Sequence, residues 1–528
     1  MYSQLVAALE RCLTDPSAEN QLVSSLSDLP KLDEMQMEQL LEELLNFAQN
    51  NSAASQSDQQ WPRLLFPCIN RLAANKSDDA TLSSANICQR LRQLYTICPP
   101  REALRNQILG TLASMHNEIA YKVWCDLVCE NPPLDRVTIP IAFTELLTPN
   151  RQLPAWFYEQ LIAHATKHVS VAPAIFDLMN YGSRTHDLDS HPASSRVGEL
   201  RGLLGNLVGQ MSKIEEGTLP ADVEPAKIAE IIGDSVALIV SLCDALAIMK
   251  DEQSIGKFHQ AMGLKHRRIQ TEAAAALMVL GDEAGKETLL KLAEHPVARL
   301  RVLAYARELD FENDISLEHR GDIALAESHL AMWLAEPTQM GVAPTKMHLV
   351  DNRELNWPSY EHPMQCYLFR FAYGDEETGY SNIGISGPLT HAFPADIKHL
   401  SVQDMYAAFA GWQTIHEEIF NVPIVRARDV LSAEAQKLER RLDEQDFSEA
   451  TPIALTSFFG QYALVVQAVQ DNESGFAIVD ENGVDWIDAT DTHESENTAE
   501  DRRIDWQLAL DIWRGRKLLA NFNPVTEF

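Results

Sequence analysis

The chain has 528 residues, of which 45% are hydrophobic and 23% charged, so it has the composition of a soluble globular protein and is too long for a single hydrophobic core. Its formal net charge of −33 at pH 7 repels nucleic-acid phosphates and anionic lipid, which argues against a nucleic-acid or membrane partner. We expect two or three domains, or a repeat array followed by one domain.

Residues 1–335 show the apolar spacing of helices. The clearest case is the segment 36–49, where a stripe of leucines together with Phe47 is separated by glutamates. Proline pairs at 99–100 and 132–133, and single prolines at 149 and 220, interrupt the pattern. These features predict a run of helical hairpins of irregular length.

A weak 31-residue repeat is the most informative feature, and it is clearest over residues 236–312. Leu238, Ile269 and Leu300 are spaced by this period, and so are the small or apolar residues four positions after each of them. Helices are predicted at 269–280, 287–293 and 300–309. A repeat of this length in helical sequence predicts stacked helix pairs, each too small to bury its own apolar face.

The repeat resembles the HEAT-like repeats first named in phycobilisome lyases, over about 70 residues. In that family an aliphatic–Arg pair is followed by small residues, and the unit ends near Gly-Asp. Leu300-Arg301 matches the pair and Gly281-Asp282 matches the end, whereas Ile269-Gln270 departs from the pair. The resemblance implies an α-solenoid. A lyase activity would need, in addition, a nucleophile or an acid in the groove.

The composition changes after Pro337, where aromatic, glycine and β-branched residues become more frequent and the apolar period becomes two. Strands are predicted at 365–373, 380–386, 462–469 and 475–480, with Asn482-Gly483 as a hairpin turn. Helices are predicted at 401–420, 432–446 and 506–519. This region resembles a domain found behind such repeats in uncharacterised bacterial proteins. The expected fold is mainly α: an irregular HEAT-like α-solenoid over residues 1–335, then a smaller α+β domain over residues 340–528.

The best candidate for a ligand site is a set of aromatic and polar residues on loops beside the predicted sheet. These residues are Trp357, Tyr360, Tyr380, Ser381, Asn382 and His391. Such side chains at a sheet edge are common on recognition surfaces. The alternative interpretation is that the aromatics cap the core and the polar residues form turns.

A basic patch at one edge of the repeats is the candidate partner-binding surface. Its members are Arg267, Arg268, Arg299 and Arg301. In so acidic a chain, these guanidinium groups could dock an acidic partner. The alternative is that they form ion pairs with carboxylates of the repeats themselves, such as Asp282 or Glu308.

Three other segments contain the residue types that bind metals. The loop 186–191 holds two histidines and two aspartates, but it is too short to close a coordination sphere alone. The acidic run 480–496 has its glycine too early for an EF-hand. His416-Glu417 and His493-Glu494 are dyads of the kind that HEAT-repeat di-iron hydroxylases carry, yet both lie outside the predicted repeats. We therefore expect neither a metal nor a cofactor.

The remaining features favour a cytoplasmic interaction protein. The eight cysteines are scattered, which predicts buried thiols in a reducing compartment, and the N-terminus lacks the regions of a signal peptide. No Walker loop, dinucleotide fingerprint or nucleophile elbow occurs. The leading hypothesis is a non-enzymatic scaffold or adaptor with a protein partner. The alternative is a small-molecule sensor or an enzyme whose site lies in the C-terminal domain.

Overall fold

The computed structural model describes most of the chain. The described residues are 2–15, 18–27, 31–52, 60–74, 85–149, 153–165, 167–185, 188, 190–218, 224–374, 379–414, 420–423, 433–442, 445, 447–489 and 504–523. They form two compact units: an N-terminal unit, Met1–Leu289, and a C-terminal unit, Leu290–Phe528.

The N-terminal unit is helical throughout its described residues. Its helices are α1 (Tyr2–Thr14), α2 (Glu19–Ser27), α3 (Glu34–Asn51), α4 (Trp61–Ala74), α5 (Ala85–Ile97), α6 (Ala103–Ser114), α7 (Glu118–Glu130), α8 (Ile139–Thr144), α9 (Ala155–Ala165), α10 (Ala172–Arg184), α11 (Val197–Glu215), α12 (Pro225–Ile248), α13 (Ile255–Met262) and α14 (Arg267–Val279). Short 3-10 turns lie at Glu145–Leu147, Ser194–Arg196 and Glu252–Ser254. Helix α15 (Glu283–Leu292) spans the boundary between the units.

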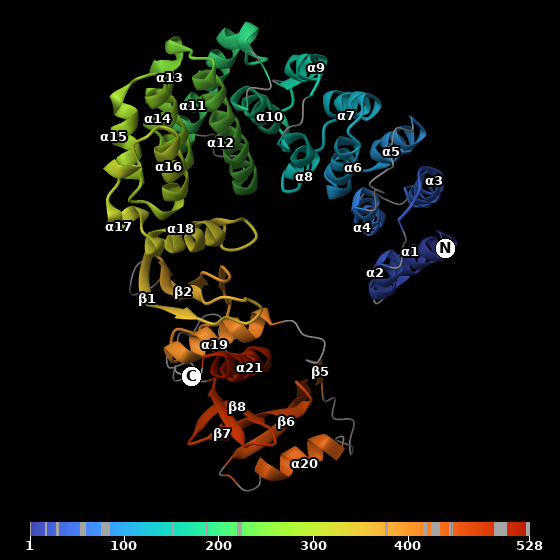
Figure 1. The fold of residues 1–528 in the computed structure, drawn as a ribbon, viewed down its shortest axis with the longest axis vertical. Helices are drawn as coiled ribbons and strands as arrows, with labels where there is room; N and C mark the ends of the chain where they lie inside the picture. Colours follow the sequence, from blue (N-terminus) through green and yellow to red (C-terminus); the bar gives the residue numbers. More distant parts are fainter. Residues whose placement is uncertain are drawn as a thin grey trace. The chain divides into compact units, whose positions relative to one another are not determined.

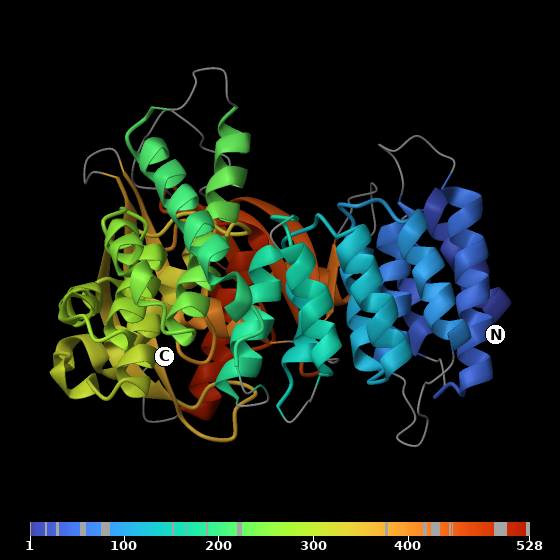
Figure 2. The same ribbon diagram turned by 90° about the horizontal axis from the view of Figure 1, so that it is seen from above.

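Most of these helices pack on the helix two positions earlier in the chain. This holds for α5, α6, α7, α8, α9, α10, α12, α13 and α14. Helices α5, α7 and α9 accordingly lie along one side of the unit, and α4, α6 and α8 lie along the other (Figure 1). Seen from above, neighbouring helices between α3 and α8 run alongside one another (Figure 2). One continuous core joins them from Leu5 to Leu277.

Local sequence explains where individual helices begin. Asp33 precedes α3 and accepts a hydrogen bond from the backbone N–H of Gln36, whose side chain accepts one from Asp33 in return. Pro225 occupies the first turn of α12, where its missing N–H leaves no intrahelical bond unmade. Among the described residues, the segment Lys227–Ile248 is the one helix long and apolar enough to cross a bilayer, and 61% of its apolar window is buried.

The 31-residue period holds for only one step. Leu238 on α12 and Ile269 on α14 are both buried, as predicted, but on α16 (Pro296–Glu308) Leu300 is half-buried and Ala304 is exposed. A 31-residue step from the start of α14 would place the next start at Ala298, whereas α16 begins at Pro296. The apolar face of α16 is therefore set by other residues than the repeat predicts.

The C-terminal unit begins with helices and continues with two antiparallel sheets. Its helices are α16 (Pro296–Glu308), α17 (Leu317–Arg320), α18 (Asp322–Ala335), α19 (Val402–Gln413), α20 (Ala433–Leu442) and α21 (Trp506–Phe522), with a 3-10 turn at Glu312–Asp314. Its strands are β1 (Lys346–Leu355), β2 (Met364–Tyr373), β3 (Tyr380–Ser386), β4 (His391–Ala392), β5 (Phe420–Pro423), β6 (Ser448–Phe458), β7 (Gln461–Gln470), β8 (Glu473–Val479) and β9 (Val484–Asp488). The sequence places the change from helical to mixed structure at 335–340; α16 to α18 nevertheless belong to the same compact unit as the sheets.

This unit is built in layers, which Figure 1 shows from α18 down to α20. Helix α18 covers one face of the first sheet, whose order is β1-β2-β3-β4. The other face packs on α19 and α21, which also pack on the second sheet, of order β5-β6-β7-β8-β9. Helix α20 covers the far face of that second sheet.

The two halves of this unit repeat the same arrangement: a helix, four antiparallel strands and a second helix. Strands β2 and β7 both have ten residues, with nearly identical burial patterns, and β3 and β8 both have seven. Counted from the turn, each hairpin has seven residue pairs, which end at Tyr367–Ser386 and Leu464–Val479. Strand β5 is an addition to the second half.

The last helices of the two halves, α19 and α21, cross where each carries a glycine. A Cβ at Gly411 would overlap the backbone carbonyl of Asp511, and one at Gly515 would overlap that of Ala407. Position 411 of α19 thus faces position 511 of α21, and position 407 of α19 faces position 515 of α21. This reciprocal pairing is what a local twofold axis between the two helices requires. Glycine is needed at both positions because the backbones touch.

Candidate functional site

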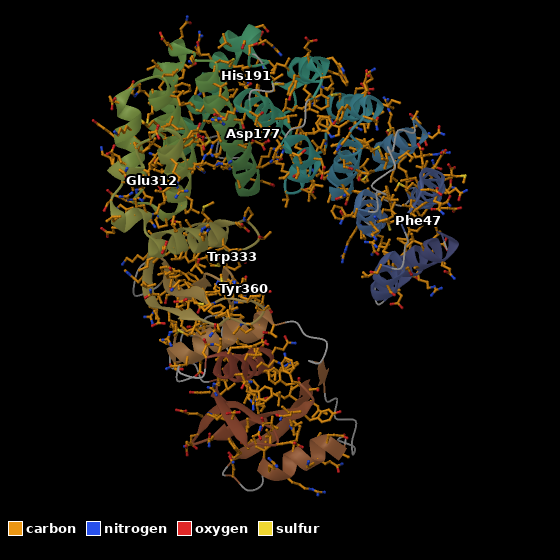
Figure 3. All side chains as sticks on the ribbon, in the orientation of Figure 1. Phe47, Asp177, His191, Glu312, Trp333 and Tyr360 are labelled. Carbon is orange, nitrogen blue, oxygen red and sulfur yellow. The ribbon has the colours of Figure 1, made fainter. Side chains whose placement is uncertain are left out.

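The six residues predicted to bind a ligand do not meet in one cavity. Trp357 is only 1% exposed and belongs to the core between the sheets, where its indole Nε1 donates to Oε1 of Gln413 at 2.6 Å. Tyr360 is exposed (Figure 3), and its hydroxyl donates to the carbonyl of Pro388 at 2.7 Å. Trp357 therefore belongs to the core and Tyr360 stabilises a turn, which agrees with the alternative interpretation.

Asn382 is completely buried and makes its hydrogen bonds within the chain. Its Nδ2 donates to the carbonyls of Phe393 and Ala395, at 3.0 and 2.8 Å, and to the Tyr380 hydroxyl at 3.1 Å. Its Oδ1 accepts from the backbone N–H groups of Ile383 and Ile397. Strand β4 ends at Ala392, so this amide takes the place of the ladder that a longer strand would supply.

Three of the six, Tyr380, Ser381 and Asn382, lie on β3, and the first two of them point to opposite faces. Tyr380 packs with the aromatic cluster under α18, stacked on Tyr373 with ring centroids 6.4 Å apart. Ser381 pairs with Ala372 in the ladder, and its side chain points to the other face. Strand alternation thus separates residues that are neighbours in sequence.

His391 lies in an aromatic cluster at the edge of the first sheet. Its ring stacks on Trp412 with centroids 3.9 Å apart and meets Trp333 edge-on at 5.4 Å; Trp333 is labelled in Figure 3. Burial lowers the pKa of His391 to about 4, so the ring is neutral at pH 7. Trp412 remains 47% exposed and gives the cluster a solvent-facing side.

Among the predicted partner-binding arginines, Arg299 is buried and satisfied within the C-terminal unit. Its Nε donates to the carbonyl of Ala293 at 2.8 Å, and its Nη1 donates to the carbonyl of Ala324 and to Oε2 of Glu327, at 2.8 and 2.6 Å. The side chain is 4% exposed. Arg299 therefore joins α16 to α18 and presents no charge to a partner.

The other three arginines are exposed. Arg301 lies over the ring of Tyr305 and donates to its hydroxyl at 2.8 Å. Arg267 donates to Gln270 at 2.9 Å, and Arg268 has no ion-pair partner in the described part of the chain. Arg267 and Arg268 belong to the N-terminal unit and Arg301 to the C-terminal unit. Of the predicted patch, the two adjacent guanidinium groups on α14 are the ones that lie side by side and exposed in one unit.

Sequence reasoning missed a second buried arginine of the same kind, Arg105 on α6. Its Nε donates to the carbonyl of Cys98 at 2.8 Å, its Nη1 donates to Oδ1 of Asn131 at 3.0 Å, and it lies over the ring of Tyr95. Both Arg105 and Arg299 occur in the first turn or so of a helix that follows a proline-containing turn. This position at the start of a helix is the sequence feature from which their structural role could have been predicted.

The loop 186–191 lies partly outside the described residues, but its last histidine is well placed. His191 is 5% exposed (Figure 3); its Nε2 bonds Oδ1 of Asn180 at 3.0 Å, and its Nδ1 accepts from the backbone N–H of Ala193. Asn180 in turn donates to the carbonyl of Ser241 on α12. Burial lowers the pKa of His191 to about 4. This imidazole is a neutral structural bridge.

The metal-binding hypotheses receive no further support. Among the described residues, no group of three or more His, Cys, Asp or Glu side chains could hold a metal ion. The dyads 416–417 and 493–494 and the acidic residues after 489 lie outside the described residues. Asp480 caps the hairpin turn, where its Oδ1 accepts from the N–H groups of Asn482 and Gly483. All eight cysteines are buried and reduced, and burial raises the pKa of Cys68 to about 12.

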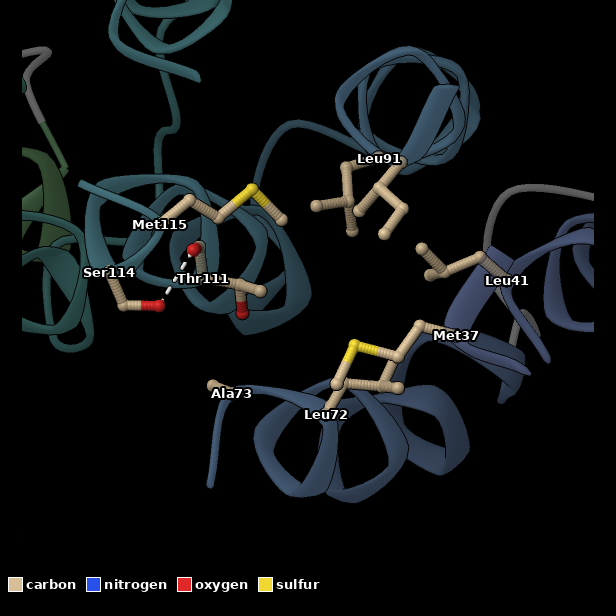
Figure 4. Close-up of a pocket in the computed structure, with 9 residues that line it drawn as sticks. Met37, Leu41, Leu72, Ala73, Leu91, Thr111, Ser114 and Met115 are labelled. Atoms are coloured by element: carbon tan, nitrogen blue, oxygen red, sulfur yellow. Dashed lines mark hydrogen bonds between the residues drawn. The ribbon is translucent and has the colours of Figure 1, made fainter. Parts of the chain in front are cut away.

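The described part of the N-terminal unit includes an enclosed hollow and an open one. One is an enclosed cavity of about 10 Å³ between α3, α4, α5 and α6, which has room for one water at most (Figure 4). The other is an open groove of about 550 Å³ between α11 and α13, lined by Glu215, Glu216, His259 and Lys265 among others. Nε2 of His259 lies 2.8 Å from Asp282, and Glu215 accepts from the backbone N–H of Lys265.

Comparison with known proteins adds no relative. No protein-family model matches the chain, and neither the curated proteins nor the solved structures include a significant match.

Proposed function

We propose that the protein is a cytoplasmic, non-enzymatic scaffold that binds a protein partner through a HEAT-like α-solenoid in its N-terminal region. The observation that carries the proposal is the packing of each helix on the helix two positions earlier, which holds from α5 to α14 except for α11. Helices that pack in this way form two rows, each with a long exposed side. Repeat proteins use such surfaces to bind extended partners.

The proposed partner is a protein with an acidic segment. Arg267 and Arg268 are adjacent and exposed on α14, where guanidinium groups can form paired hydrogen bonds with carboxylates. The rest of the chain is strongly acidic, with a net charge of −33, so nucleic acid and anionic membranes are not expected partners.

The test is a quantitative capture experiment with the full chain and two charge-reversal variants. In the first variant, Arg267→Glu and Arg268→Glu reverse the proposed docking charges. In the control, Lys250→Glu and Lys291→Glu reverse two other exposed charges. We expect the wild type and the control to retain one protein at stoichiometric amounts from native lysate, and the first variant to lose it.

Cross-linking then locates the partner on the chain. Cross-links that concentrate on α13 and α14 would support the proposal, since α14 carries the two arginines and α13 directly precedes it. If no protein is retained stoichiometrically, or if both variants retain it equally, the proposed scaffold function or its docking site is wrong.

A further inference from the structure

A second groove lies wholly within the C-terminal unit, between α18 and the first sheet. Its volume is about 410 Å³, a size that suits a small molecule. It is lined by Asp322, Leu325, Ala326 and His329 of α18, by Gln365 and Tyr367 of β2, and by Ser386, Gly387 and Thr390 after β3. None of the six residues predicted to bind a ligand is among them.

The packing of α18 explains why the groove opens where it does. Toward its C-terminal end the helix touches the sheet, and a Cβ at Gly384 would lie 2.8 Å from Leu330. Two residues further along β3, the helix no longer fills the space above Ser386 and Tyr367. These two residues face each other across the ladder, so their side chains lie next to each other on the sheet surface.

Both of these hydroxyl-bearing residues are buried, yet neither hydroxyl has a hydrogen-bond partner in the described part of the chain. Tyr367 is 7% exposed and Ser386 is 2% exposed, and both line the groove. Neither hydroxyl oxygen is among the buried polar atoms that lack a partner, so both reach the open groove. Two adjacent hydroxyls that only the groove can reach are therefore available to a bound molecule.

The second half of the unit serves as an internal comparison. At the pair equivalent to Tyr367–Ser386, it has Leu464 opposite Val479, and both are completely buried under α20. The fold therefore closes without polar groups at this place. The first half carries two hydroxyls and an open groove where the second half has a sealed apolar core.

We propose that this groove binds a small amine that also carries hydroxyl groups, held by Asp322, Tyr367 and Ser386. The hydroxyls and the Gln365 amide can each donate and accept, and so suit a hydroxylated molecule. Among the described residues that line the groove there is no lysine or arginine, and Asp322 is the one carboxylate. Asp322 is exposed in the first turn of α18, and a cationic group of the ligand can form a charge-assisted hydrogen bond with it.

The experiment measures saturation transfer by NMR from the full chain to three hexose derivatives of different charge. Glucosamine is cationic, glucose is neutral and gluconate is anionic. We expect transfer to glucosamine at millimolar concentration, weaker transfer to glucose and none to gluconate. Asp322→Asn should weaken glucosamine binding about tenfold or more, since it removes a charge-assisted hydrogen bond.

Conservative variants separate a specific site from a general surface effect. Tyr367→Phe and Ser386→Ala remove one hydroxyl each and should both reduce the transfer. Ser381→Ala is the matched control, because Ser381 is on the same strand but outside the groove. Thermal unfolding of each variant checks that the fold is intact.

Three results would overturn the proposal: no transfer to glucosamine, transfer that Asp322→Asn and Tyr367→Phe leave unchanged, or stronger binding of gluconate. The inference is independent of the scaffold function, because it uses neither α14 nor its arginines. A protein partner without glucosamine binding, or the reverse, would leave one proposal standing without the other.

Discussion

The crossing of α19 and α21 gives the sharpest test of the C-terminal unit. A Cβ at Gly411 would lie 2.7 Å from the carbonyl carbon of Asp511, and one at Gly515 would lie 2.7 Å from Cα of Ala407. Each clash is with helix backbone, which cannot move aside by changing a rotamer. Gly411→Ala and Gly515→Ala should therefore force the helices apart.

The expected cost follows from two opposing contributions. Overpacking of a tight core costs about 1–3 kcal/mol, and a backbone clash belongs at the upper end of that range. Replacing glycine by alanine inside a helix returns about 1 kcal/mol. Each substitution should therefore lower the free energy of unfolding by about 2 kcal/mol, equivalent to about 30-fold faster hydrogen exchange in α19 and α21.

Hydrogen exchange with mass-spectrometric readout of peptides from the full chain is the suitable assay, because the chain has two units and global unfolding need not be two-state. The matched control is Gly202→Ala on α11, where an added Cβ meets nothing within 4 Å. It should slow exchange in α11. If Gly411→Ala or Gly515→Ala behaves like this control, the close crossing of the two helices is wrong.

Three further predictions concern buried polar groups. Because the pKa of His191 is lowered in the folded state, the unfolded chain binds the proton more readily, and the N-terminal unit should lose about 2 kcal/mol of its free energy of unfolding as pH falls from 7 to 5. Hydrogen exchange of α10 peptides at the two pH values, corrected for intrinsic rates, should show this loss in the wild type and not in His191→Asn. Arg299→Met should destabilise α16 and α18 by about 3–5 kcal/mol, measured by hydrogen exchange in a urea titration, because it leaves Glu327 without its partner. Arg301→Met should change stability by less than about 1 kcal/mol, and equal effects of the two variants would contradict the assigned roles. Asn382→Ala should cost about 2–4 kcal/mol by stranding backbone groups at 383 and 393–397, and unchanged protection of these amides would refute that assignment.

The success of strand prediction from sequence depended on burial. The predicted strands at 365–373, 380–386, 462–469 and 475–480 are confirmed within a few residues, and so is the hairpin at Asn482-Gly483. Strands β1, β4, β5 and β6 were not predicted. β1 is the edge of its sheet and has mostly exposed or half-exposed residues, so its apolar pattern is weak. β6 begins with four exposed residues and contains Pro452.

The helices were predicted from the same signal. The segment 36–49 is confirmed as part of α3, and 506–519 as part of α21. The helix predicted at 401–420 ends at Gln413. The apolar pattern did not predict which residues of α16 are buried. This helix starts two residues before the position that the 31-residue repeat predicts, so a different face packs inward.

Candidate site residues were harder to predict than elements, because residue type does not reveal burial. Asn382 and Arg299 have the chemistry of ligand-binding groups, yet each makes its hydrogen bonds inside the chain. Conversely, Tyr367 lies in an apolar run that predicts only a core strand, and its free hydroxyl becomes visible when the register and the position of α18 are known.

The internal duplication of the C-terminal unit helps to distinguish polar residues that stabilise the fold from polar residues that can bind a ligand. This comparison needs no related sequence. Positions that the two halves share, such as Gly411 and Gly515, are what the architecture requires, because both helices cross at the same distance. Positions where the halves differ in polarity, while the backbone stays the same, are not required by it. The pair Tyr367–Ser386 against Leu464–Val479 is such a difference, and it coincides with the open groove. A polar pair that the fold can do without, in a place that it leaves accessible, is better explained by binding than by stability.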